Sequence, residues 1–97
     1  MSSILDIIGI SKMYYLYILE SILTKRYYVG CTNNIQKRLI EHNSGKSRYT
    51  KTALPWKLIY QECYNNLAEA RNREKQIKGW KKRKAIEALL KAIGPIV

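Results

Sequence analysis

Two tyrosine-rich segments decide the fold of this chain, Tyr14-Tyr15-Leu16-Tyr17-Ile18-Leu19 and Tyr27-Tyr28-Val29-Gly30. Both have the aromatic and aliphatic content of β-strands, and a short polar connection separates them, so they predict a hairpin. The chain has eight Tyr and no Phe, and five of the eight Tyr lie in these segments. Because a tyrosine hydroxyl can donate, accept or lose a proton, the hairpin predicts a polar face on a small sheet.

The remaining sequence predicts the order strand, strand, helix, strand, helix, helix. The three strands are expected at residues 13–20, 26–32 and 56–63. The three helices are expected to begin at the N-cap candidates 32–34, at the capping box 66–69 and at residue 82, and to end near residues 43–45, 79 and 93. One such set of elements in 97 residues makes a single domain with a thin core.

The apolar positions predict which side chains are buried. On the first helix, Ile40 is expected to point inward together with Leu39. In the third strand, Trp56, Leu58 and Tyr60 occupy alternate positions and are therefore expected to share one face of the sheet.

The charge of the chain indicates its partner. Eighteen Lys and Arg against seven Asp and Glu give a net charge of +11, which favours a polyanion, most simply DNA or else RNA. The alternative from charge alone is a ribosome-associated or merely basic protein. Cys31 and Cys63 have no CxxC spacing and, with a single His in the chain, cannot complete a zinc site. We expect both thiols to be reduced and to serve as small apolar fillers, which indicates a location in the reducing cytoplasm.

Both ends of the chain are expected to lie outside the domain, which we place at residues 13–93. The apolar run within residues 1–12 is too short to span a bilayer, and no basic residue precedes it, so neither a membrane anchor nor a secretory signal is expected. Met13 directly precedes the first strand, which makes residues 1–12 a candidate for a dispensable extension. Residues 94–97 are expected to form a tail.

Three side chains beyond the hairpin could carry chemistry. Arg38 and His42 are four residues apart and share one helix face, which can approach Tyr17 and Tyr28. Arg can bind two phosphate oxygens at once, and His can move a proton near neutral pH. Each also has a simpler explanation, because Arg38 could be part of a solvated basic face and His42 a capping or packing residue.

Glu74 is the third side chain, and it stands in the most basic part of the chain. As a lone carboxylate among cations it could be an ion-pair partner, which contributes little at a surface and is the simpler explanation for Glu74 alone. It could also bind Mg²⁺, which often takes one or two protein carboxylates and completes its octahedron with water and substrate phosphate.

Taken together, these segments resemble the paired signature of the GIY-YIG nucleases. The two triplets are Tyr15-Leu16-Tyr17 and, after ten residues, Tyr28-Val29-Gly30. The first has Tyr in place of the Gly of the motif, and the second has Val in place of Ile. The resemblance continues through the first helix, the basic loop, the third strand and the helix with Glu74. It covers about residues 13–90 and is closest to the small stand-alone bacterial type, which is little more than the nuclease core.

The resemblance implies an α+β fold, a three-stranded antiparallel sheet flanked by helices, and metal-dependent hydrolysis of DNA in repair, recombination or the processing of branched or damaged DNA. By position, Tyr17 would help to activate the attacking water, and Tyr28 would position water or phosphate. Arg38 would stabilise charge on the phosphate, and His42 would assist proton transfer or order the tyrosine hydroxyls. Glu74 would hold one Mg²⁺ or Mn²⁺ ion, with no small-molecule cofactor.

One departure from the family pattern concerns the helix after Glu74. Several members carry an Asn about three turns beyond the metal-binding Glu, and residues 83–87 here contain none. A contact that this Asn makes elsewhere is therefore missing here or supplied by another residue.

A set of basic side chains and one glycine is expected to contact the nucleic acid: Gly30, Lys37, Lys46, Arg48, Lys51, Arg73 and Lys78. Gly30 would allow a close approach of backbone and phosphate. Two other functions stay open. One is a non-catalytic nucleic-acid-binding module, which nine basic residues within 71–91 would support equally well. The other is a protein-interaction adaptor that uses Trp80 and the last helix. The sequence predicts neither the DNA structure that is cleaved nor the oligomeric state.

Overall fold

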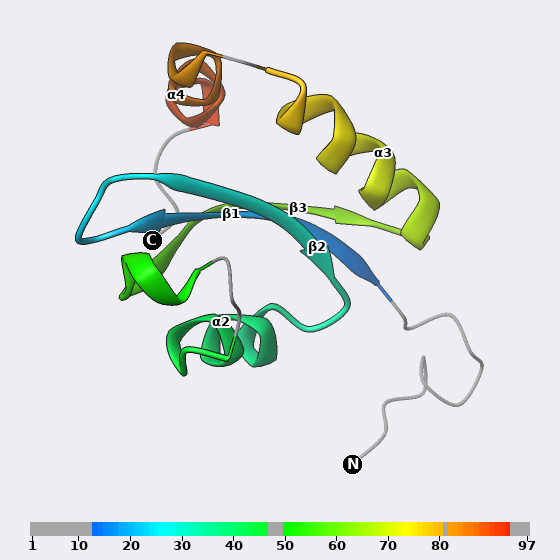
Figure 1. The fold of residues 1–97 in the computed structure, drawn as a ribbon. Helices are drawn as coiled ribbons and strands as arrows, with labels where there is room; N and C mark the ends of the chain where they lie inside the picture. Colours follow the sequence, from blue (N-terminus) through cyan, green and yellow to red (C-terminus); the bar gives the residue numbers. More distant parts are fainter. Residues whose placement is uncertain (1–12, 47–49, 81, 94–97) are drawn as a thin grey trace.

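The computed structural model describes residues 13–46, 50–80 and 82–93 (Figure 1). The predicted order of elements is confirmed, with an additional short 3-10 helix before the last strand. The elements are β1 (Tyr14–Ser21), β2 (Tyr27–Thr32), α2 (Ile35–Asn43), η1 (Lys51–Ala53), β3 (Trp56–Tyr64), α3 (Leu67–Lys78) and α4 (Arg83–Ile93). The predicted extension 1–12, the predicted tail 94–97 and Arg48 lie outside the described residues.

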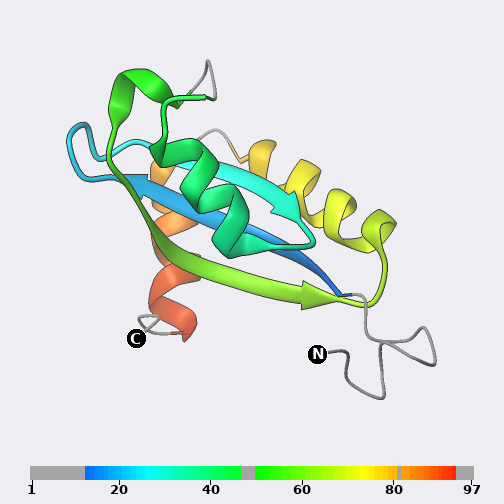
Figure 2. The same cartoon turned by 90° about the horizontal axis from the view of Figure 1, so that it is seen from below.

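The three strands form one antiparallel sheet in the order β2-β1-β3, which confirms the predicted architecture. Figures 1 and 2 show α2 and η1 on one face of this sheet and α3 and α4 on the other. The central strand β1 is buried from both sides, which explains its almost continuous apolar sequence. Leu16 and Ile18 pack towards α3 and α4, and Tyr17 and Leu19 pack towards α2.

The helices α2 and α3, which come after the edge strands β2 and β3 in the chain, both begin at predicted N-cap residues. The Asn34 side chain accepts a hydrogen bond from the Lys37 backbone N–H at 3.0 Å, and the Asn66 side chain accepts one from Glu69 at 2.8 Å. Such caps satisfy N–H groups that have no partner within the helix. They fix where α2 and α3 begin, and hence which residues face the sheet.

Two predictions of side-chain direction are wrong. Ile40 is 69% exposed, because the inward stripe of α2 continues from Leu39 to His42, three residues on, and Ile40 lies to one side of it. Tyr60 packs with α3 rather than beside Trp56 and Leu58, because the β1–β3 register shifts between Ile18 and Leu19. A β-bulge of this kind adds one residue to a strand and turns the following side chains to the other face.

The prediction that both thiols are small apolar fillers is wrong for Cys63. Cys31 is half-buried, and Cys63 is exposed on β3, an edge strand of the sheet. Both thiols are unpaired.

A carboxylate on β3 ties the sheet to α3. Glu62 accepts hydrogen bonds from the hydroxyls of Tyr60 and Tyr64 and from Arg73 Nε at 3.0 Å and Nη2 at 3.2 Å. Burial by itself would raise the pKa of Glu62, but the hydrogen bonds from Arg73, Tyr60 and Tyr64 lower it below its ordinary value. The Arg73 guanidinium also lies 5.5 Å from the centre of the Trp80 ring, so the cluster orients the end of α3.

Replacing Glu62 with Gln is expected to reduce the free energy of unfolding by about 1–3 kcal/mol, since hydrogen bonds to a charged and largely buried acceptor are lost. Glu87→Gln is the matched control, because Glu87 pairs with Arg83 in an exposed pair and is expected to contribute less than about 1 kcal/mol. Urea unfolding of both variants measures the difference, and equal losses would argue against Glu62 as a tie between β3 and α3.

Candidate active site

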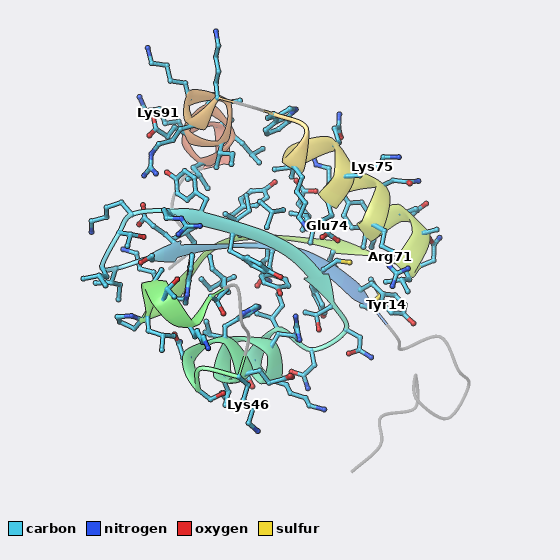
Figure 3. The ribbon with its side chains drawn as sticks, in the orientation of Figure 1. Tyr14, Lys46, Arg71, Glu74, Lys75 and Lys91 are labelled. Atoms are coloured by element: carbon cyan, nitrogen blue, oxygen red, sulfur yellow. The ribbon has the colours of Figure 1, made fainter. Side chains whose placement is uncertain are left out.

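The five candidate catalytic residues come from four elements that meet near the β2 edge of the sheet. Tyr17 belongs to β1, Tyr28 to β2, Arg38 and His42 to α2, and Glu74 to α3. Glu74 comes from the helix on the opposite face of the sheet from α2 and points down towards the sheet (Figure 3). Burial is the main cause of the raised pKa of the Tyr17 hydroxyl, and the nearby charge of Glu74 makes a small further contribution. The structure thus brings together the residues that the sequence singled out, from both sides of the sheet.

Gly30 gives Tyr17 the space to reach this edge. The two residues are partners in the β1–β2 ladder, and the Tyr17 side chain lies across the glycine. A Cβ atom on Gly30 would stand 2.6 Å from the Tyr17 hydroxyl oxygen and 2.7 Å from Cζ, which no side chain could tolerate without moving the ring. The small size of Gly30 therefore serves the placement of the tyrosine, and its predicted contact with a phosphate stays a prediction.

A buried chain of hydrogen bonds starts at Tyr17. Its hydroxyl lies 3.1 Å from His42 Nε2, and His42 Nδ1 lies 3.1 Å from the Thr50 hydroxyl. All three side chains are fully buried or nearly so. The Trp56 indole donates to the Thr50 carbonyl at 2.8 Å and holds the Thr50 backbone in place. Sequence reasoning missed Thr50, because a hydroxyl eight residues from the histidine, inside a basic loop, gives no periodic signal.

Burial lowers the pKa of His42, and the charge of Arg38 lowers it further. The ring is therefore neutral near neutral pH and carries one N–H. If Nδ1–H donates to Thr50, Nε2 is left to accept the Tyr17 hydroxyl proton. Tyr28 completes the aromatic group, with its ring edge-on to His42 at 4.7 Å between centroids.

The Tyr17 hydroxyl stays protonated near neutral pH. Burial raises its pKa to about 12, although a hydrogen bond from Arg38 acts in the opposite direction. Arg38 by itself therefore does not make a phenolate. The Arg38 side chain is 40% exposed, so a phosphate can reach its guanidinium from solvent. Arg38 Nη1 lies 3.6 Å from Glu41 Oε2.

Glu74 is the candidate ligand for a cation. Its side chain is 20% exposed, and its carboxylate is paired with Lys78 Nζ at 2.5 Å. Among the residues that the structure describes, no group of three or more His, Cys, Asp and Glu could hold a metal ion. One accessible carboxylate does not fit a structural zinc site, but it fits Mg²⁺ or Mn²⁺, which can complete their shell with water and substrate phosphate.

The residues predicted to contact nucleic acid divide into three groups. Lys37, Lys46, Lys51 and Lys78 are exposed. Arg73 is held by Glu62, as described above, and Gly30 is buried under Tyr17. Figure 3 shows Lys46 beside α2 and Arg71 and Lys75 on α3, so basic side chains flank the sheet on both faces. Burial raises the pKa of the Cys31 thiol on β2 to about 11, and Arg71 is close enough to oppose this rise.

The structure is a small α+β domain in which Tyr17, Arg38 and Glu74 come from three elements near one edge of a three-stranded sheet. The sequence profile of the GIY-YIG catalytic domain matches residues 13–87, and the chain belongs to this family. It is 50% identical over 66 residues to a UPF0213 protein of Syntrophus aciditrophicus, a match that covers 66% of this chain and 75% of that protein.

Two further proteins support the assignment. A UPF0213 protein of Bacillus pumilus is 45% identical over 58 residues, which are 59% of each chain. The solution NMR structure of a UPF0213 protein from Bacillus halodurans has a TM-score of 0.54 and 30% identity, and the match covers 82% of this chain and 84% of that one. In the described part of our structure, no helix has the length and apolar character needed to cross a bilayer.

His42 is the only histidine in the chain, which makes its buried state testable through pH. Its pKa is lower folded than unfolded, so the unfolded state binds the proton more tightly. Stability is therefore expected to be complete above the unfolded value of about 6.5 and to fall as the pH drops below it. Urea unfolding at pH 7.5 and 5.5 should show this loss in the wild type and a flatter profile in His42→Gln. Equal slopes would contradict a buried neutral imidazole.

Replacing Thr50 with Val is expected to change the tautomer of His42, because Nδ1 loses its partner. In ¹⁵N NMR spectra of the single imidazole, the wild type should show Nδ1 protonated, and Thr50→Val should shift the ring towards the Nε2-protonated form. Thr50→Ser keeps the hydroxyl and should retain the wild-type signals. Unchanged spectra in folded Thr50→Val would remove Thr50 from the hydrogen-bond chain.

Proposed function

We propose that this protein is an endonuclease that hydrolyses DNA phosphodiester bonds with one Mg²⁺ or Mn²⁺ ion. The observation that carries the proposal is the convergence of Tyr17, Arg38 and Glu74 from three elements near one sheet edge. The net charge of +11 favours a polyanionic substrate. We propose DNA rather than RNA, and a role in repair, recombination or the processing of branched or damaged DNA. The two unpaired cysteines support a cytoplasmic location.

In this proposal the scissile phosphate lies against Arg38, whose N–H groups bind the oxygens on which negative charge grows. Because a phenolate is rare at a pKa of about 12, Tyr17 acts as a proton relay rather than a standing base. Its oxygen takes a proton from the attacking water while its own proton passes to His42 Nε2. The resulting hydroxide bonds to phosphorus, and the bond from phosphorus to the leaving oxygen breaks. The oxygen departs as an alkoxide and takes a proton from solvent, and His42 returns its proton to solvent.

Two further residues complete the arrangement. The Tyr28 ring packs edge-on against His42. In this proposal it keeps the imidazole in position and limits the space open to water. Glu74 would hold the divalent cation, which supplies positive charge to the departing oxygen when it is bound. Lys78 must then leave the carboxylate, and it becomes free to pair with a phosphate.

The experiment is cleavage of supercoiled plasmid, single-stranded DNA and branched DNA by the purified protein, with Mg²⁺, Mn²⁺ or EDTA. We expect nicking with either metal and none with EDTA, and the activity should elute with the 11.4 kDa protein. Tyr17→Phe, prepared in parallel, should be much less active, because the relay hydroxyl is missing. Cleavage by both proteins at the same rate would indicate a contaminating nuclease.

The second candidate is a DNA-binding module without catalysis. The pairing of Glu74 with Lys78 and the lack of an Asn within residues 83–87 favour it. Salt-sensitive DNA binding with no cleavage under any of these conditions would be its signature. The adaptor hypothesis has less support, because Trp80 packs partly against the core and stands among basic residues, whose charge favours a polyanion over a protein partner.

A further inference from the structure

A cavity of about 520 Å³ lies between β2, α3 and α4 and is not used by the proposed chemistry. Its size is within the range of small-ligand sites in proteins. Buried Val29, Ile77 and Ile86 contribute its apolar surface, and the partly buried rings of Tyr27 and Trp80 contribute aromatic surface. Among the described residues, Lys78 is the cation that lines it, and Lys78 is exposed.

The two rings are held in position by guanidinium groups. Arg83 Cζ lies 4.2 Å from the centre of the Tyr27 ring, and Arg73 Cζ lies 5.5 Å from the centre of the Trp80 ring. Both arginines are anchored in turn, Arg73 by Glu62 and Arg83 by Glu87 at 3.0 Å. Rings that are already ordered lose little conformational entropy when a flat ligand stacks on them.

The cavity lies on the α3 and α4 face of the sheet, and it borders β2, the strand that also carries Tyr28 and Gly30 of the candidate active site. Tyr28 lines the cavity and also makes the edge contact with His42. Lys78 lines it and is paired with Glu74. Tyr27 is three residues from Gly30, which corresponds to roughly 10 Å along an extended strand. A nucleotide adjacent to a phosphate at the active site can therefore reach the cavity.

We infer that this cavity binds an unpaired nucleobase of the DNA strand whose phosphate lies at the active site, and that the protein prefers DNA with unpaired nucleotides there. The inference rests on the proposed function for its substrate, DNA. Aromatic rings stack on every base, so binding through the rings is tolerant of sequence. Lys78, which lines the cavity, and Arg73 and Arg83, which lie over its two aromatic rings, match the charge of the strand better than that of an apolar peptide.

A matched pair of probes separates base stacking from phosphate binding. One is a labelled oligothymidylate, and the other is an oligomer of equal length in which abasic residues replace the thymidines. Fluorescence anisotropy in EDTA prevents metal-dependent cleavage. The wild type should bind the oligothymidylate about tenfold more tightly than its abasic equivalent. A duplex of the same sequence should bind only as tightly as its phosphate charge predicts, because its bases are already paired and stacked.

Trp80→Leu is expected to reduce the preference for bases to less than about threefold and to leave binding of the abasic oligomer unchanged. Trp80→Phe, which keeps an aromatic ring, should retain most of the preference. Circular dichroism checks that both variants are folded. A folded Trp80→Leu protein that keeps the full preference would overturn the inference.

A second measurement needs no substitution. An oligonucleotide that carries 5-iodouracil is irradiated with the wild-type protein, and the cross-linked peptide is identified by mass spectrometry. Cross-links are expected at Trp80 or Tyr27, and cross-links confined to other residues would also overturn the inference.

The two proposals can fail separately. Base-dependent binding without cleavage would remove the proposed function but keep the cavity site. Cleavage without a base preference would remove the cavity site but keep the proposed function.

Discussion

Glu74→Gln is expected to lower the rate of DNA cleavage about 10²–10³-fold while the protein stays folded. The Glu74 carboxylate is the candidate cation ligand, and an amide is a much weaker ligand for a divalent ion. Glu74 is part of a surface pair with Lys78, so its loss should change stability by less than about 1 kcal/mol. The measurement is plasmid nicking under saturating Mg²⁺, with urea unfolding in parallel.

Glu69→Gln is the matched control, because Glu69 lies on the same helix, is exposed and is in its first turn. It should cleave at the wild-type rate. Lys78→Met provides a test with the opposite sign, since removal of the competing ammonium should lower the metal concentration needed for half-maximal activity. If Glu74→Gln cleaves as fast as Glu69→Gln, Glu74 is not the metal ligand.

Gly30→Ala is expected to reduce the free energy of unfolding by about 1–3 kcal/mol, because the new methyl group displaces the Tyr17 ring from a tightly packed position. The same displacement moves the Tyr17 hydroxyl away from His42 and Arg38. A misplacement of about 1 Å at a reacting centre can lower the rate about 10²-fold, so cleavage should fall by that order. Thermal unfolding and plasmid nicking measure the two effects.

Gly79→Ala controls for the loss of a glycine. Gly79 ends α3 with an ordinary negative φ of −73°, and the nearest atom to an added Cβ is the Gln76 carbonyl oxygen at 3.3 Å. We expect wild-type activity and only a small change in stability. Combining Gly30→Ala with Tyr17→Leu should recover part of the stability but none of the activity. A Gly30→Ala protein with full activity would show that Tyr17 need not stay where it lies.

Much of the fold could be predicted from local patterns. The two tyrosine strands, the N-cap residues Asn34 and Asn66, and the helix end at Gly79 all act through neighbours in sequence. The face of Tyr60 could not be predicted in this way. It depends on a bulge that pairs Leu19 with Leu58 and Ile18 with Tyr60, which is a property of two strands together and not of either one.

The candidate site shows the same division. The helical spacing of Arg38 and His42 placed both residues on the α2 face that approaches Tyr17. The sequence did not predict the role of Thr50, because it depends on a contact between a loop and α2. It also did not predict that Gly30 makes room for Tyr17, because that contact joins two strands of the sheet. The ionisation of Tyr17 also needed the structure. Arg38 favours the phenolate, but burial has the larger effect, and only the packed environment shows which one dominates.

The central claim is that a cation at Glu74 and a phosphate at Arg38 meet beside Tyr17. The most direct test is a crystal structure of Tyr17→Phe with Mn²⁺ and a short DNA strand, in which anomalous scattering locates the metal. We predict one Mn²⁺ ion on the Glu74 carboxylate, a phosphate between it and Arg38, and Lys78 displaced from Glu74. A phosphate bound on another face of the domain, with Glu74 still paired to Lys78, would contradict the account.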